Sequence, residues 1–94
     1  MLLRKWNYNL DEYEPYNVPD EWHCRYFNMD MTDIINCCQC GKEVKFGKCY
    51  SSHEVHTSTG FGYAVCEECH EVEIIRERRG KQNVRRFDKQ EEII

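Results

Sequence analysis

Cys37-Cys38-Gln39-Cys40-Gly41 and Cys66-Glu67-Glu68-Cys69 are the two stretches that most constrain the structure of this 94-residue chain. Each contains a Cys-x-x-Cys couple, and 25 residues separate the two couples. One couple presents two sulfurs to an ion, and a second completes a tetrahedron with Zn–S bonds of about 2.3 Å. The spacing therefore predicts one structural Zn²⁺ bound by Cys37, Cys40, Cys66 and Cys69.

The chain has seven cysteines, so three lie outside the predicted site. Cys38 competes with Cys37 as a ligand, but Cys38-Gln39-Cys40 is shorter than the usual turn, which favours Cys37. Cys24 and Cys49 are predicted to pack as small apolar side chains. A disulfide scaffold is the alternative, but the odd count and the ligand spacing favour a reducing compartment and a metal. Iron also accepts four thiolates, whereas zinc is the usual ion in closed sites of this spacing.

Length and composition agree with one small domain that a metal supports. A chain of this length buries too little apolar surface for a large stability margin. Charged residues make up 32% of the sequence, and no stretch approaches the roughly 20 apolar residues of a membrane span. The N-terminal residues also lack the apolar centre of a secretory signal. We therefore expect a cytoplasmic domain over residues 1–94 that does not associate with membranes.

Charge divides this domain into three segments. Residues 1–36 are acidic and aromatic, with three basic side chains, seven acidic ones and seven aromatic rings. Residues 37–79 form the expected zinc-binding core. Residues 80–94 form a basic tail or a short helix, and residues 76–94 together contain seven basic and four acidic side chains. The N-terminal segment and the C-terminal end are thus of opposite charge.

The N-terminal segment is predicted to be an extended wrap on the core. Apolar and polar residues alternate over residues 5–10, which indicates a half-buried strand. Pro15 and Pro19 then exclude a regular element over residues 14–20. A short turn of helix is expected over residues 20–26.

The residues between and after the couples predict a β-hairpin followed by a helix. The expected strands cover residues 43–46, 49–58 and 61–65, with turns at Gly47-Lys48 and Thr59-Gly60. After Cys66, glutamates precede arginines and Gly80 follows, a charge order that stabilises a helix over residues 67–79. Val72, Ile75 and the stem of Arg79 lie on one face of this helix. Residues 81–94 predict only a weak helix or a frayed tail.

The order of a two-thiol turn, a hairpin and two thiols opening a helix resembles the treble-clef class of zinc fingers over residues 37–79. The resemblance implies a small α+β domain in which zinc holds a knuckle, a hairpin and a helix together. It implies no particular activity. A zinc ribbon, in which a strand follows the second couple, is the alternative fold.

Histidines near the second couple suggest a nuclease. Cys66-x-x-Cys69-His70, with Glu54-Val55-His56 upstream, is similar to the HNH endonucleases, in which one histidine activates water and another helps to bind the catalytic metal. That family also needs an asparagine in the motif loop, and the nine residues between His56 and Cys66 contain none. His53 and His56 are otherwise expected at the surface or half-buried. A degenerate nuclease is therefore the third function considered.

A basic run near the C-terminus suggests nucleic-acid binding. Its positive charges are close enough in sequence to follow a phosphate backbone, although the chain's net charge of −4 repels polyanions at long range. A nucleic-acid-binding regulator is thus the alternative function. The residues assigned to it are Arg76, Arg78, Arg79, Lys81, Arg85 and Arg86.

The acidic, aromatic segment suggests a protein interface, because Tyr and Trp anchor interfaces and acidic residues steer them to basic partners. The residues assigned to it are Asp11, Glu12, Tyr13, Glu14, Tyr16, Asp20, Glu21 and Trp22. A four-thiolate site has no open coordination position, so the metal is expected to hold the fold rather than activate water. We therefore expect a binding protein and not an enzyme.

The whole chain resembles the zinc-containing anti-CRISPR proteins that phages direct at the type II effector nuclease. The resemblance rests on Tyr13-Glu14-Pro15-Tyr16, Asp20-Glu21-Trp22 and the two thiol couples. It implies a phage-encoded inhibitor that acts in the host cytoplasm. Its partner would be this basic, nucleic-acid-handling enzyme, and an acidic face would prevent DNA binding there.

Overall fold

The structure of the chain is a computed structural model that describes residues 1–27 and 30–79. The expected tail over residues 81–94 lies outside these residues. Within them, no helix has the length and apolar character needed to cross a bilayer. The elements in chain order are β1 (Leu2–Asn7), β2 (Glu12–Asn17), β3 (Ile34–Asn36), β4 (Glu43–Lys45), the 3₁₀ helix η1 (Phe46–Lys48), β5 (Tyr50–His56), β6 (Gly62–Val65) and a helix over residues 67–79.

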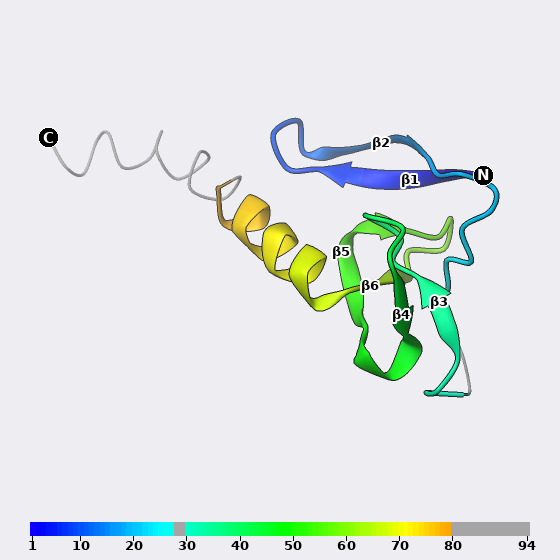
Figure 1. The fold of residues 1–94 in the computed structure, drawn as a ribbon. Coiled ribbons are helices and arrows are strands. Elements are labelled where there is room, and N and C mark those ends of the chain that lie inside the picture. The colour runs from blue at the N-terminus through cyan, green and yellow to red at the C-terminus, as the bar shows by residue number, and fades with distance from the viewer. Residues whose placement is uncertain (28–29, 80–94) are drawn as a thin grey trace, which may run out of the picture.

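The described part of the chain forms two antiparallel sheets, a short 3₁₀ helix and one α-helix (Figure 1). The four-stranded sheet has the order β2-β1-β5-β6, and β3 pairs with β4 in a second, two-stranded sheet. Lys5 of β1 lies opposite Val55 of β5, so the N-terminal hairpin extends the hairpin between the two cysteine couples. The predicted α+β class is therefore correct. The N-terminal segment, however, is a paired hairpin over much of its length.

Asn7 organises the turn between β1 and β2. Its side-chain oxygen accepts hydrogen bonds from the backbone N–H groups of Asn9 (2.9 Å) and Leu10 (3.1 Å). Its carbonyl accepts another from the N–H of Asp11 (2.8 Å), which has a positive φ of 56°. Asn and Asp favour such turns because their short polar side chains bond the local backbone. The strand predicted over residues 5–10 therefore ends at Asn7.

The prediction that prolines exclude regular structure is wrong for β2. This strand runs through Pro15, which lies opposite Arg4 of β1. Because β2 is an edge strand, one of its sides needs no ladder hydrogen bonds, and proline is tolerated there. The short helix expected over residues 20–26 is also wrong, since these residues form a turn and irregular backbone.

The hairpin predicted between the two couples is present as β5 and β6. A bulge shifts its register between Ser51 and His56. There the Ser52 hydroxyl accepts hydrogen bonds from the N–H groups of Glu54 (3.0 Å) and Val55 (2.8 Å) in place of the neighbouring strand. The bulge breaks the alternation of inward and outward side chains, so Glu54 and Val55 are both buried.

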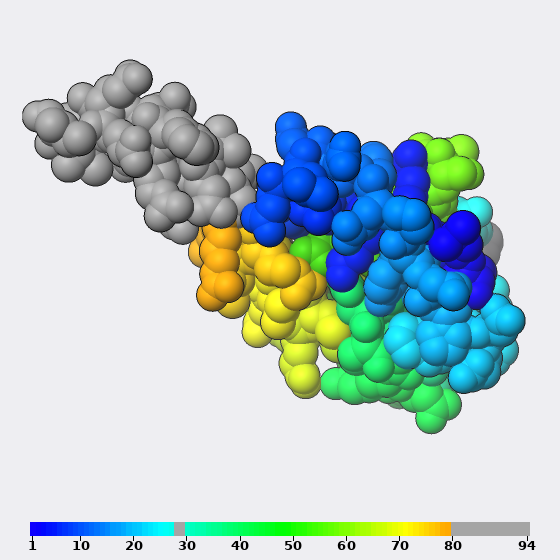
Figure 2. All heavy atoms as spheres, turned by 90° about the horizontal axis from the view of Figure 1, so that it is seen from above, coloured from blue at the N-terminus to red at the C-terminus, as the bar shows by residue number. Residues whose placement is uncertain are grey.

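The apolar core is small and surrounds the cysteine couples. Figure 2 shows the N-terminal residues, in blue shades, over part of the face seen from above. So little apolar burial provides a narrow margin over the conformational entropy of the chain. Within the described ranges, the buried cluster consists of Val18, Cys37, Cys38, Val55, Val65 and Cys66.

The helix predicted over residues 67–79 is present, but its polar side faces the core. Val72 and Ile75 are 44% and 49% exposed, whereas Glu73 is completely buried. Cys69 directs this rotation, because a side chain four residues later on a helix lies on the same face. The position of the cysteine, not the apolar pair, therefore decides which side of the helix is buried.

Candidate metal centre

The sulfurs of Cys37, Cys40, Cys66 and Cys69 lie within 4.8 Å of one another. The first couple lies in the connection from β3 to β4, and the second leads from β6 into the helix. The Cys40 and Cys66 sulfurs are 3.9 Å apart, close to the edge of about 3.8 Å in a tetrahedron with Zn–S bonds of about 2.3 Å. The four cysteines are thus placed to bind one metal ion.

Backbone hydrogen bonds hold the first couple in a tight turn. The Gly41 N–H donates to the Cys37 carbonyl (2.8 Å), and the Cys37 N–H donates to the Lys42 carbonyl (2.9 Å). Gly41 has a φ of 78°, a conformation that glycine adopts without steric cost. Lys42 also forms an ion pair of 3.2 Å with Glu68, so the turn is linked to the helix that carries the second couple.

Local surroundings shift the pKa values of Cys37, Cys40 and Cys69, and not all in the same direction. Burial raises the pKa of Cys37, but backbone N–H donors, among them those of Cys66 (3.3 Å) and Gln39 (3.4 Å), outweigh burial and lower it overall. Burial raises the pKa of Cys40 and Cys69. A bound cation favours thiolates, so metal uptake would release protons and would weaken as the pH falls.

The other three cysteines lie outside the sulfur cluster. Cys38 is buried in the core, where its carbonyl accepts a hydrogen bond from the Tyr16 hydroxyl (3.2 Å). Half-buried Cys24 packs against this core, and the Cys49 thiol donates to the Lys45 carbonyl (3.4 Å). All seven cysteines are free thiols, with no disulfide between them. The structure thus brings Cys37, rather than Cys38, to the other three sulfurs.

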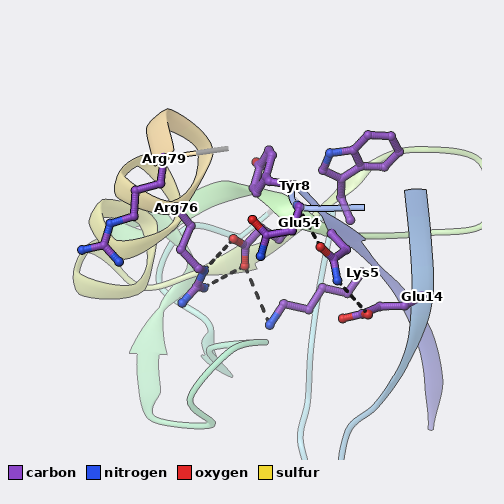
Figure 3. A pocket seen from close by; sticks show the side chains of 9 residues that line it. Lys5, Tyr8, Glu14, Glu54, Arg76 and Arg79 are labelled. Atoms are coloured by element: carbon purple, nitrogen blue, oxygen red, sulfur yellow. Dashed lines mark hydrogen bonds and ion pairs between the residues drawn. The ribbon is translucent and has the colours of Figure 1, made fainter. Parts of the chain in front are cut away.

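Two buried glutamates beside the cysteines tie the first couple to the sheet and the helix. The Gln39 amide nitrogen is 2.7 Å from a carboxylate oxygen of Glu54 on β5 and 2.7 Å from one of Glu73 on the helix. Arg76 donates two further hydrogen bonds of 2.7 Å to Glu54 (Figure 3). Lys5 lies 3.8 Å from the same carboxylate. Glu54 is therefore neutralised by basic side chains from two elements.

Glu73 accepts hydrogen bonds from the first cysteine couple and from β5. The Ser52 hydroxyl donates to one of its oxygens (2.6 Å), as does Gln39, and the His53 backbone N–H donates to the other (2.7 Å). Buried carboxylates are costly unless such donors satisfy them. The predictions from sequence give no structural role to these two buried glutamates. One signal was available, because Glu73 follows Cys69 by one helical turn.

Gly41 is also constrained by the indole of Trp22, which lies so close that a Cβ on Gly41 would overlap it. We expect Gly41→Ala to destabilise the fold by about 2 to 4 kcal/mol, because left-handed backbone strain adds to overpacking. Gly60→Ala is the matched control, since Gly60 has a φ of 97° but a Cβ there would meet only the Arg4 side chain, at 4.0 Å. Chemical denaturation measures the free energy of unfolding of both variants. Equal losses of stability in the two variants would contradict the assigned Trp22 contact.

The residues expected to bind a protein partner fall into two groups. Asp11, Glu12, Tyr13 and Glu14 are exposed on the β1–β2 hairpin, and Glu21 is exposed beyond it. Tyr16 and Trp22 are half-buried against the core, and Asp20 pairs with the N-terminal amine (2.6 Å). The hairpin therefore carries most of the freely exposed acidic side chains of this set.

The basic residues expected to contact nucleic acid are also divided. Arg76 is engaged with Glu54, whereas Arg78 and Arg79 are exposed. The other assigned residues, Lys81, Arg85 and Arg86, lie outside the described residues.

Three of the four histidines lie on β5 and the helix, namely His53, His56 and His70. The His53 ring pairs with Glu77 (2.9 Å), and His70 stacks on Tyr50 with ring centroids 4.5 Å apart. His56 packs edge-on against Tyr13, and burial lowers its pKa, as does nearby Arg4. In the described part of the chain, no histidine belongs to a group of three or more ligand residues close enough to share an ion.

Comparison of the chain with family models, curated proteins and solved structures gives no match.

Proposed function

We propose that the metal is a single structural Zn²⁺ and that residues 37–79 form a treble-clef-like zinc finger. Support comes from the order of knuckle, hairpin and helix, and from the spacing of the four sulfurs. A helix follows Cys66, where a zinc ribbon would have a strand. Four thiolate ligands leave no open coordination position, so the ion would stabilise the fold without activating water.

We further propose that the protein is a non-enzymatic binding protein that docks through its β1–β2 hairpin. The observation that carries this proposal is the side-chain set at the hairpin's exposed end. Asp11, Glu12 and Glu14 are exposed, next to the apolar side chain of Leu10 (62% exposed) and the ring of Tyr13 (39% exposed). Exposed carboxylates together with exposed apolar surface on one hairpin fit a basic protein surface that also offers an apolar contact.

The partner class follows from this charge. A nucleic-acid-handling enzyme presents a basic channel, and an acidic protein placed there competes with DNA by charge and by volume. The resemblance to anti-CRISPR proteins suggests the type II CRISPR effector nuclease, whose guide and target duplex occupy such a channel. The proposed activity is therefore inhibition of DNA binding by that enzyme, without chemistry by this chain.

Charge reversal on the hairpin tests this proposal. We expect the triple variant Asp11→Lys, Glu12→Lys and Glu14→Lys to lose at least about tenfold in affinity for a purified effector, because attraction becomes repulsion. Biolayer interferometry and a DNA-loading assay measure the loss. The matched control is Glu43→Lys, Glu67→Lys and Glu71→Lys, which changes charge equally at exposed positions on β4 and the helix. Equal losses for both triples, or no binding by the wild type, would contradict the proposal.

Nucleic-acid binding by the helix is the second candidate function. Exposed Arg78 and Arg79 favour it. This function predicts that the protein shifts DNA or RNA in a gel mobility assay, and that the shift weakens steeply as the salt concentration rises. Absence of a shift at low salt would exclude it.

A further inference from the structure

A polar cavity of about 340 Å³ lies between β1, the turn after it, β5 and the helix over residues 67–79 (Figure 3). Its volume falls in the range of about 300 to 1,000 Å³ that small-molecule sites occupy. None of the four clustered cysteines lines it. The cavity is thus separate from the candidate metal centre.

The helix end of this cavity is rich in unused hydrogen-bond donors. Arg76 donates to Glu54 through Nε and Nη2, which leaves its other terminal nitrogen available. Arg79 is exposed one turn later, lines the same cavity, and forms no ion pair with any residue in the described ranges. Lys5 adds a third positive charge at the floor. Because Glu54 is already paired, the remaining N–H donors of these basic side chains can bind a further anion.

The strand end of the cavity is aromatic. Trp6 and Tyr8 line it, and Trp6 is held in place by an edge-on contact with Tyr13 at a centroid distance of 4.9 Å. The Tyr8 hydroxyl donates to the His53 carbonyl (3.4 Å). Burial, followed by the nearby Glu77 carboxylate, raises the pKa of Tyr8, so this phenol stays protonated at neutral pH. Two neutral aromatic residues therefore line this end of the cavity.

We propose that this cavity binds a nucleotide, with its phosphate at Arg76 and Arg79 and its base against Trp6 and Tyr8. Guanidinium groups match phosphate oxygens in charge and geometry, and every base has a face that stacks on aromatic rings. The carboxylate of Glu14, bonded to Asn7 (3.1 Å), lies at the end away from the helix and repels a phosphate there. The orientation follows from this repulsion. The proposal does not depend on the protein partner inferred above.

Calorimetric titration of the full chain tests the site with three probes: adenosine monophosphate, adenosine and inorganic phosphate. We expect saturable binding of the monophosphate, tighter than either fragment by at least about tenfold, because only the nucleotide uses both ends of the cavity. A short single-stranded oligoadenylate distinguishes the source of the ligand. If it competes with the monophosphate, the cavity accepts a nucleotide within a strand; if it does not bind, the cavity accepts free nucleotides.

Arg79→Ala and Arg78→Ala form the matched pair of variants. Both remove one exposed charge from the same helical turn, but of the two only Arg79 lines the cavity. Arg79→Ala is expected to weaken monophosphate binding about tenfold, and Arg78→Ala less than about twofold. Far-UV circular dichroism confirms that both variants are folded. Equal losses in the two variants, or no saturable binding by the wild type at millimolar concentration, would overturn the proposal.

Discussion

Replacing Cys37 by serine should leave the protein without a cooperative unfolding transition. Cys37 is completely buried, and its sulfur belongs to the cluster that we assign to zinc. Structural zinc contributes about 10 to 16 kcal/mol in small zinc fingers, which matches or exceeds the whole stability of about 5 to 15 kcal/mol of a typical domain. Loss of one ligand would therefore remove more free energy than this small core supplies. Near-UV circular dichroism and thermal denaturation measure the effect.

Cys49→Ser is the matched control for this variant. Cys49 is half-buried and lies outside the sulfur cluster, and its thiol donates to the Lys45 carbonyl, a bond that a serine hydroxyl can also make. We expect the Cys49→Ser protein to bind metal as the wild type does, and its free energy of unfolding to change by less than about 1 kcal/mol. A Cys37→Ser protein that unfolds at the wild-type temperature would show that the cluster carries no structural metal.

Replacing Glu73 by alanine should be the next most damaging change, costing about 3 to 5 kcal/mol. The variant removes the acceptor for three donors, which are the Gln39 amide, the Ser52 hydroxyl and the His53 backbone N–H. Each buried donor left without a partner costs about 1 to 3 kcal/mol, and the missing side chain also leaves a cavity. Urea denaturation monitored by tryptophan fluorescence measures the loss.

Two further variants make this experiment decisive. Glu71→Ala, two residues earlier on the exposed side of the helix, should change stability by less than about 0.5 kcal/mol. Glu73→Gln keeps the size and one acceptor oxygen, and should fall between the other two. If Glu73→Ala were as stable as Glu71→Ala, the buried hydrogen-bond network would be wrong.

The region of the cysteine couples could be predicted from the sequence because its constraints are local. Each Cys-x-x-Cys couple fixes a turn, and the charge order after Cys66 marks a helix. The hairpin of β5 and β6 follows from strand and turn residues close together in the chain. The hairpin and the helix over residues 67–79 could therefore be anticipated from local signals, and the sulfur cluster from the preference of one ion for two such couples.

Residue type alone predicts the burial of neither glutamate, because a carboxylate is usually exposed. Glu54 lies on the same side of β5 as buried Ser52, with exposed His53 between them, so its burial follows from the position of β5 within the sheet. Glu73 is buried because Cys69 sets the rotation of the helix. Combining the ligand assignment with helical geometry would have identified Glu73, whereas Glu54 required the sheet.

The N-terminal hairpin was missed for a related reason. Its pairing with β5 joins residues about 50 positions apart, as in the contact of Lys5 with Val55, and such register is not encoded locally. Proline by itself predicts an interruption at Pro15, whereas the edge position of β2 accommodates it. Strand position within a sheet therefore outweighed the local signal.

Metal analysis of freshly purified protein tests most directly whether two distant sulfur pairs share one ion. Native mass spectrometry together with elemental analysis should find one zinc per chain. Removing it with a chelator should abolish the near-UV circular dichroism signal of the aromatic residues packed around the core. Protein that contains no stoichiometric metal, or whose near-UV spectrum is unchanged by chelation, would contradict a zinc-held fold.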